Sequence, residues 1–292
     1  MDFVFENSRG EVLKLWNNSL FYLVDQEGQT QANADIYALT VGNIDGDLIT
    51  NVRAQPRTIT LTLRINPTVN VEDAKRSILR IVKLKQKGSI IWTQNDRTLR
   101  ISGIVEAIDM PRWNSAVAMQ ISLYCSIPFW EDTDETILQI DDSIPLHYFT
   151  ALDDHSSDML YFPAEGIAFS EYNATRSRTF YNWGDVSVGM NIEIMAIDTV
   201  TNPIIYDAEG NFFGVGYGTK QVTLQAGDVI NICTIAGSLS VTKNGSTNLL
   251  NYVVPRSTWL QMHTGENIFR IDSADVETDN VTFSLTYKQR YI

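Results

Sequence analysis

Strict alternation of apolar and polar side chains is the feature that most constrains how this chain folds. Residues 58–65, TITLTLRI, place Ile or Leu at every second position and Thr or Arg between them. Residues 98–106 and 117–125 repeat the pattern. Successive side chains of a β-strand point to opposite faces, so this period predicts three strands of a sheet with one buried face. Gly103, in the second segment, predicts a bulge or a close approach between strands.

One segment breaks the alternation and predicts a helix. Residues 70–88 begin with Asn70, carry acidic residues in the expected first turn and three lysines near the end, and finish at Gly88. A side-chain cap, charges that complement the helix dipole and a terminal glycine are typical helix boundaries. Its apolar stripe, from Ala74 to Val82, is expected to lie across the sheet.

The composition of the chain changes after Trp130. Residues 1–130 contain 14 Lys and Arg and 13 Asp and Glu, whereas residues 131–292 contain 8 and 22. The 292 residues also exceed what one domain usually needs. We therefore expect two domains, residues 1–132 and 133–292, because a strand runs here into a proline, two aromatic residues and a cluster of acids. The residues expected at this junction are Cys125, Pro128, Phe129 and Trp130.

Residues 179–292 consist of short apolar segments separated by turns. The segments recur at intervals of about 8–12 residues, which predicts an antiparallel β-sandwich. Gly210, Gly227 and Gly245 stand in hairpin-like turns. Residues 131–178 are more acidic, and their short apolar pieces predict edge strands. The excess of acids disfavours nucleic-acid binding, because a negative surface repels phosphate.

The sequence carries no membrane or export signal. It has no run of 18 apolar residues, and the N-terminal MDFVFENSRGEV does not have the pattern of a signal peptide. We expect a soluble protein made in a cytoplasm, without membrane insertion. Cys125 and Cys233 each lie in an apolar alternating segment, so we expect two buried, reduced thiols and no disulfide.

Motifs for catalysis or cofactor binding are missing. The glycine-rich segment from Gly214 precedes no predicted helix, so it is interpreted as a turn and not as a phosphate-binding loop. No G-x-S-x-G motif occurs, and neither cysteine has a nearby histidine. One group of histidines and acids lacks the ligand spacing of a metal site. This group consists of His147, Asp153, Asp154, His155 and Asp158. No catalytic residue, cofactor or metal is predicted, and the chain is not expected to be an enzyme.

Two carbohydrate-related alternatives stay open. Trp183, Trp259 and several tyrosines are able to stack on sugar rings, although core packing is the commoner role of aromatic residues in strands. A pair of carboxylates at glycosidase separation would leave no trace in the sequence. The alternatives are therefore a carbohydrate-binding adhesin module and, less favoured, a glycan-cleaving enzyme.

Several segments occur in an order that carries a resemblance across nearly the whole chain. They are FVFENSRGEVLKL, RTITLTLRI, GSIIW, ISGIVEAI and QISLYCSIPFW, then NWGDVSVGMNIEIMA, NPIIYDAEGNFF, LQAGDVINICTIAGSLSVTKNG and STWLQMHTGENIFRI. This order resembles the distal tail protein family, often called Dit, of long-tailed non-contractile phages and related prophages. In that family a Cys and a Pro-Phe pair close the first domain, and Cys125, Pro128 and Phe129 occupy those places here.

The resemblance implies a mainly β fold, with an N-terminal β-barrel-like domain that is related to tail-tube subunits and has one α-helix, followed by a C-terminal galectin-like β-sandwich. It implies a structural role as a homo-hexameric ring, the baseplate hub that joins the tail tube to the tail tip and leaves a central channel for DNA. The implied partners are the tail tube protein, a tail-associated lysin or baseplate proteins, and a receptor-binding protein. The implied location is the virion tail tip, after assembly in the cytoplasm of a bacterial host.

Residues 38–56 are the candidate belt between subunits of such a ring. A ring of identical subunits needs contacts that extended loops or edge strands can provide, and this segment is long, β-prone and too polar for a core. Arg53 and Arg57 are candidates for pairing with carboxylates of a neighbour, with an ordinary surface role as the alternative. The candidate interface residues are Asp45, Asp47, Arg53 and Arg57.

Overall fold

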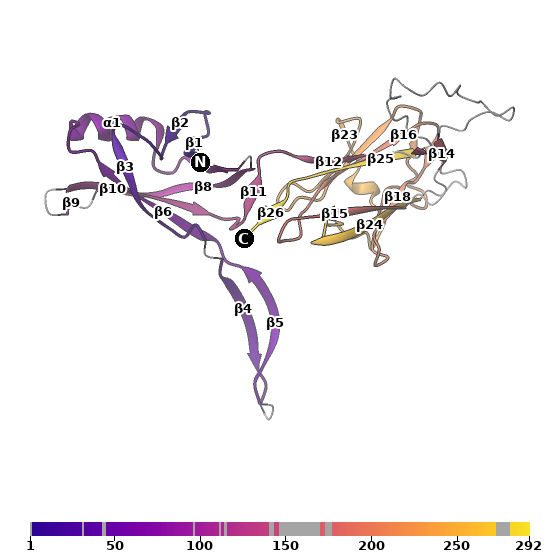
Figure 1. The fold of residues 1–292 in the computed structure, drawn as a ribbon. Coiled ribbons are helices and arrows are strands. Elements are labelled where there is room, and N and C mark those ends of the chain that lie inside the picture. Colours follow the sequence, from indigo (N-terminus) through magenta and orange to yellow (C-terminus); the bar gives the residue numbers. More distant parts are fainter. Residues whose placement is uncertain are drawn as a thin grey trace, which may run out of the picture. The chain divides into compact units, whose positions relative to one another are not determined.

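The protein divides into two compact units. In the computed structural model, the first unit is Met1–Asp134 together with Lys288–Ile292, and the second is Glu135–Tyr287. Both units consist mainly of strands, and the described residues contain one α-helix (Figure 1). The prediction of a mainly β fold with one helix is confirmed. The structure describes residues 2–30, 32–42, 45–95, 97–110, 112–113, 116–139, 143–145, 170–172, 177–272 and 281–292.

The first unit is built on one large antiparallel sheet. The three segments predicted from their alternation are strands β6 (Arg57–Ile65), β8 (Arg97–Asp109) and β10 (Ala116–Cys125), and β10 lies between the other two. The strand path is β2-β1-β7-β8-β10-β6-β3, and β9 pairs with β10. The remaining bounds are β1 (Asp2–Asn7), β2 (Val12–Lys14), β3 (Phe21–Glu27), β7 (Lys87–Gln94) and β9 (Arg112–Trp113).

One face of this sheet covers a single apolar core. The buried faces of β6, β8 and β10 meet side chains from β1, the helix and β7. Gly103 lies against β10, where an added Cβ would stand 2.5 Å from the Tyr124 carbonyl oxygen, so the predicted close approach is confirmed. The largest fully buried side chains of this core are Phe5, Phe21, Leu15, Ile59, Leu61, Leu63, Ile78, Ile90, Ile101 and Met119.

The helix begins as predicted and ends earlier. In α1 (Val71–Ile81), the Asn70 side chain accepts a hydrogen bond from the Glu72 amide at 2.9 Å. The predicted end at Gly88 is wrong. The chain leaves the helix after Ile81 because Asn7 donates to the Ile81 carbonyl at 3.0 Å, and the Lys85 amide donates to β8 at 2.9 Å.

Gly88 instead lies in β7, where Phe5 requires it. A Cβ at this position would stand 2.4 Å from Phe5 Cζ, a separation that packed carbon atoms do not reach. The glycine that suggested a helix terminus is therefore needed for the packing of an aromatic ring beneath the sheet.

The last residues of the chain return to the first unit. Strand β26 (Arg290–Tyr291) pairs with β11 (Trp130–Asp132), which pairs with β8. Arg290 Nε donates to Glu131 Oε1 at 2.7 Å, and the Tyr291 hydroxyl donates to Asp132 Oδ2 at 3.0 Å. The structure thus differs from the expected second domain of residues 133–292, because these contacts hold its last residues in the first unit.

The second unit is a β-sandwich, as predicted. Its core combines Ile192 and Phe283 from one sheet with Phe213 and Phe269 from the other. The six-stranded sheet has the order β12 (Thr136–Gln139), β25 (Val281–Tyr287), β16 (Asn191–Ala196), β21 (Val229–Cys233), β22 (Ser240–Lys243) and β23 (Thr247–Asn248). The four-stranded sheet has the order β15 (Ser177–Asn182), β24 (Gly265–Asp272), β18 (Ile204–Tyr206) and β19 (Phe212–Gly214).

Short elements complete the second unit. They are the pairs β13 (Ser143–Pro145) with β14 (Ser170–Tyr172) and β17 (Val200–Thr201) with β20 (Thr223–Leu224), and the 3-10 helix η1 (Leu250–Tyr252). Of the predicted edge-strand region, residues 140–142, 146–169 and 173–176 lie outside the described residues. The histidine and acid group, His147, Asp153, Asp154, His155 and Asp158, lies in that part.

The turns of the second unit fall where glycine was expected to place them. Gly210, Gly227 and Gly245 all have positive φ, in the region that glycine adopts without strain. The segment from Gly214 also contains a turn, in which Tyr217 and Lys220 exchange backbone hydrogen bonds of 3.0 and 2.8 Å. The interpretation of this segment as a turn agrees with that geometry.

Substitution of Gly88 by Ala is expected to destabilise the first unit by about 1–3 kcal/mol, the usual cost of overpacking a core. Urea denaturation measures the loss of unfolding free energy. Faster amide hydrogen exchange in β1 and β7 is expected to show that the destabilisation is located there. The matched control is Gly42→Ala, because nothing lies within 4 Å of a Cβ built there. Equal effects of the two substitutions would contradict the packing argument.

Candidate assembly interface

A two-stranded hairpin of the first unit, called the arm here, lies outside the large sheet. It consists of β4 (Ala34–Thr40) and β5 (Asp47–Ala54), which pair with each other and form a sheet of their own. Every side chain of β5 is exposed, and so is every side chain of β4 except that of Asp35. Figure 1 shows the arm standing apart from the sheet of its unit. A lone two-stranded hairpin is at best marginally stable in water.

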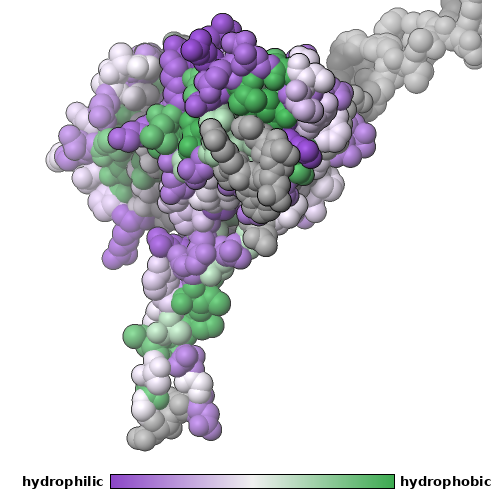
Figure 2. All heavy atoms as spheres, turned by 90° about the vertical axis from the view of Figure 1, so that its left-hand side faces the viewer, coloured by the Kyte–Doolittle hydropathy of each residue, from purple (hydrophilic) through white to green (hydrophobic). Residues whose placement is uncertain are grey.

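The arm exposes large apolar side chains on both of its faces. Ile36 is 63% exposed and pairs with Val52, whereas Leu39 is 58% exposed and pairs with Leu48 on the opposite face. Ile49 is 60% exposed. Figure 2 shows apolar residues along the hairpin. Because soluble monomers seldom expose contiguous apolar surface of this kind, the arm has the character of a protein contact surface.

Polar contacts at both ends hold the two strands in register. Arg53 Nε donates to Asp35 Oδ2 at 3.0 Å, the Gln55 amide donates to the other oxygen of Asp35, and Thr40 Oγ1 donates to Asp47 Oδ1 at 2.9 Å. Hydrogen bonds from Gln55 and Arg53 lower the pKa of Asp35. The arm therefore has a defined register although almost none of it is buried.

The base of the arm is fixed by a shared backbone acceptor. Arg57 Nη1 donates to the Gln29 carbonyl at 3.0 Å, and Trp130 Nε1 donates to the same oxygen at 3.2 Å. The guanidinium carbon of Arg57 lies 5.9 Å from the centre of the Trp130 ring. Burial lowers the pKa of Arg57, and the neighbouring Cys125 opposes this shift. The Gln29 carbonyl thus joins the segment before the arm to β6, which follows the arm, and to β11.

The four candidate interface residues do not form one group. Asp45, Asp47 and Arg53 are exposed on the arm, and Asp47 and Arg53 have partners within it. Arg57 is only 7% exposed and contacts its own unit, so it fixes the base of the arm and is not presented to a neighbour. The apolar side chains of the arm were not among the predicted interface residues, although a strand-like segment with apolar residues at both odd and even positions was their signal in the sequence. The most exposed of these are Ile36, Leu39, Leu48, Ile49 and Val52.

The residues expected at the domain junction complete the core of the first unit. Cys125 and Trp130 are buried, and the Trp130 ring meets that of Trp92 edge to face at a centroid distance of 6.3 Å. Pro128 is buried, and Phe129 lines a groove of about 250 Å³ beside β8. Cys125 and Cys233 are free thiols, and Cys233 is only partly buried.

The aromatic residues considered for sugar binding behave differently from each other. Trp259 packs against Phe213 of the sandwich core at a centroid distance of 4.8 Å. Trp183 is 70% exposed and contacts the ring of Tyr181. No group of three His, Cys, Asp or Glu side chains able to hold a metal occurs within the described residues. No described helix has the length and apolar character needed to cross a membrane.

Comparison with known proteins finds a family match in the C-terminal part of the chain. Residues 183–291 match the family model described as the siphovirus-type tail component, C-terminal domain. The match covers 109 of the 292 residues of the chain. The resemblance of the chain to the distal tail proteins, first seen in the order of its segments, is confirmed. No curated protein matches the chain.

One solved structure shows the same fold over nearly the whole chain. The crystal structure of Dit from phage SPP1 aligns with a TM-score of 0.66 and 13% identity, over 98% of each chain. Chains of the phage p2 baseplate in its activated conformation, with strontium and with calcium, align with TM-scores of 0.47. Their identities are 11% and 10%, over 100% of this chain and 99% of theirs.

The buried thiol of Cys125 makes the stability of the protein depend on pH. Burial raises the pKa of Cys125 to about 11, against the effect of the Arg57 charge, whereas an unfolded thiol ionises near pH 8.5. The unfolded chain therefore loses this proton first. The contribution is complete below about pH 8.5 and falls as the pH rises towards about 11.

We expect the urea midpoint of the wild-type protein to decrease as the pH is raised from about 9 to about 11, and to decrease more than the midpoint of Cys125→Ala measured in parallel. The comparison cancels the titration of other groups. Parallel pH profiles of the two proteins would contradict a buried neutral thiol.

Proposed function

We propose that this protein is a distal tail protein that assembles into a hexameric ring and joins the tail tube to the tail tip or baseplate. The observation that carries the proposal is the exposed apolar arm on a chain with the fold of SPP1 Dit. That protein is described as a paradigm of the hub adsorption apparatus in phages that infect Gram-positive bacteria. The proposed role is structural: the protein connects other tail proteins and catalyses no reaction.

The arm supports a ring because it provides a directional contact. A hairpin that extends from its own unit binds a different surface on the next subunit, and a head-to-tail contact of this kind forms a closed ring when its rotation closes. Each large apolar side chain contributes about 1.5–3 kcal/mol when it leaves water. The exposed apolar side chains of the arm therefore provide enough free energy to bind a neighbour, with Asp45, Asp47 and Arg53 at the polar margin.

The face of the first sheet opposite the core supports a central channel. This face carries cross-strand pairs of hydroxyl groups. The hydroxyl oxygens of Thr60 and Ser122 are 3.3 Å apart, and those of Ser89 and Ser102 are 2.9 Å apart. Arg64 and Arg100 share this face, and Arg100 is paired with Glu6, so the surface presents few unpaired cations that would hold phosphates. We propose that this face surrounds the DNA during its exit.

The proposed partners follow from the position of such a ring. They are the tail tube protein on one side, and a tail-associated lysin or baseplate proteins and a receptor-binding protein on the other. The protein would be found at the tail tip of the virion, after assembly in the cytoplasm of the bacterial host.

We expect light scattering of the purified protein to give the mass of about six subunits, and Ile49→Asp to shift it towards the monomer. The reason is that this carboxylate would be buried without a partner in the contact. Asn51→Asp is the matched control, because it adds the same charge at a polar position of the same strand. A wild-type monomer at micromolar concentration would overturn the proposal. A ring that forms equally well with either substitution would exclude the arm from the contact.

The channel assignment predicts that Thr60→Lys creates affinity for double-stranded DNA. Six added cations facing one channel are expected to strengthen binding about tenfold or more at low salt, with a steep loss as salt increases. Fluorescence anisotropy with a linear DNA fragment measures this effect. Thr247→Lys, at an exposed position of β23, is the control. Equal DNA binding by the two variants would place this face outside the channel.

A further inference from the structure

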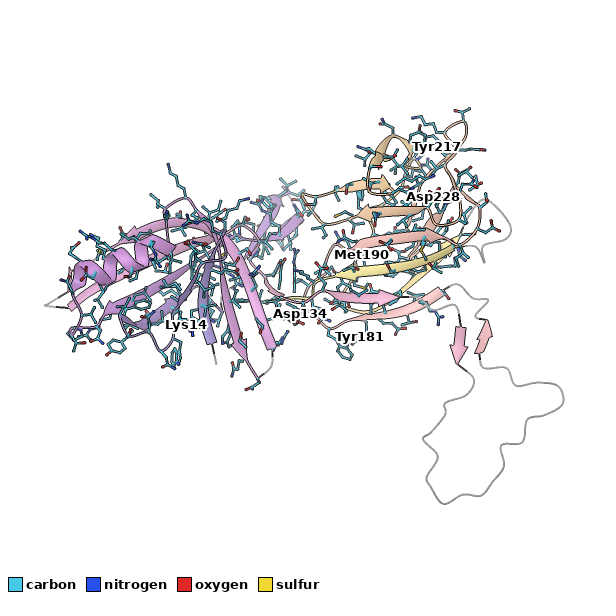
Figure 3. The ribbon with its side chains drawn as sticks, turned by 90° about the horizontal axis from the view of Figure 1, so that it is seen from above. Lys14, Asp134, Tyr181, Met190, Tyr217 and Asp228 are labelled. Atoms are coloured by element: carbon cyan, nitrogen blue, oxygen red, sulfur yellow. The ribbon has the colours of Figure 1, made fainter. Side chains whose placement is uncertain are left out.

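Two aromatic side chains of the second unit are exposed side by side. Trp183 is 70% exposed, more than any other aromatic side chain that the structure describes, and Tyr181 is 47% exposed. Their ring centroids are 4.0 Å apart, and the ring planes meet at 43°. Figure 3 shows the Tyr181 side chain pointing away from the sheet. The pair is not part of the sandwich core, which uses Phe180 of the same strand.

A buried asparagine fixes the turn that carries Trp183. Asn182 is 1% exposed, and its side-chain amide donates to the carbonyls of Val186 and Met262 at 3.2 Å each. Its Oδ1 accepts from the Gly184 amide at 2.9 Å. These three hydrogen bonds fix the backbone on both sides of Trp183, so the indole stands on a rigid support.

A second buried asparagine fixes the neighbouring segment. Asn267 is 6% exposed, donates to the His263 carbonyl at 2.7 Å and accepts from the His263 amide at 2.8 Å. This places Glu266 directly opposite Tyr181 in the β15–β24 register. Both Glu266 and His263 are exposed. The aromatic pair therefore has an acceptor carboxylate directly opposite Tyr181, and the exposed imidazole of His263 lies on the same fixed segment.

We propose that Tyr181 and Trp183 form a binding platform for a neutral oligosaccharide of hexopyranose units. The C–H groups on one face of a pyranose ring carry partial positive charge and pack against the negative face of an aromatic ring. Glu266 and His263 provide hydrogen-bond partners for the sugar hydroxyls. Because both supporting segments are already rigid, little conformational entropy is lost on binding.

Charge and size select this ligand over two others. The acids of residues 131–292 outnumber the bases by 22 to 8, which disfavours polymers rich in phosphate or uronate. A stable protein interface buries about 800 Å² on each partner, far more than two rings provide. A neutral glycan needs only a small rigid platform with polar groups at its edge.

The test is saturation-transfer NMR of the intact protein with maltotriose, cellotriose and tri-N-acetylchitotriose, each at about 10 mM, a concentration that detects weak sugar binding. We expect transfer to at least one trisaccharide, with at least a tenfold loss of affinity in Trp183→Ala. Trp16→Ala is the control, because Trp16 is an exposed tryptophan of the first unit, 47% accessible. Thermal unfolding is expected to be unchanged in both variants.

Three results would overturn the proposal: no transfer to any trisaccharide, equal binding by wild type and Trp183→Ala, or loss of acrylamide quenching of Trp183 in the assembled oligomer. The last result would instead make the pair a contact between subunits. Sugar binding does not depend on the ring, so Ile49→Asp is expected to bind as well as the wild type. The two proposals can therefore fail separately.

Discussion

The carbonyl oxygen of Gln29 is the acceptor on which the organisation of the first unit depends. It receives one hydrogen bond from Arg57, which is 28 residues away in the sequence, and one from Trp130, which is 101 residues away. One atom thus connects the chain before the arm, strand β6 after it and strand β11. The base of the arm and the start of β11 are therefore fixed by the same contact.

The arm that this contact supports has little stability of its own. The hairpin has backbone pairing and polar contacts at both ends but almost no burial, so its own stability in water is small. Any partner that covers its apolar side chains adds the missing stabilisation, because a ligand that binds only the folded form favours folding. Formation of the arm and binding of such a partner are therefore linked in free energy. A well-ordered base limits the entropy lost when the arm binds.

Local sequence patterns predicted the elements that depend on local rules. The alternation in residues 58–65 identified β6, and Asn70 marked the start of α1, because both signals act over a few residues. Gly88 misled the prediction of the helix end, since its role depends on Phe5, which is distant in the sequence. The packing of a ring against a glycine leaves no local pattern.

The candidate site was only partly predictable for the same reason. Arg53 and Arg57 look alike in the sequence, yet one is exposed on the arm and the other is buried beside Trp130. The apolar residues of the arm resemble those of an ordinary buried strand, and only the absence of covering residues in the fold shows their exposure. Nor does any local feature predict that β26 returns to β11.

The return of β26 makes the second unit an insertion. The amide of Asp132 donates to the carbonyl of Gln289 at 3.1 Å, so the chain leaves the first unit and re-enters it at one place. An insertion whose two ends meet is easily exchanged, because the host unit keeps its core and its strand pairing whichever module occupies the gap. Proteins that share the first unit are in this way able to diversify the inserted module without redesigning the unit that carries it.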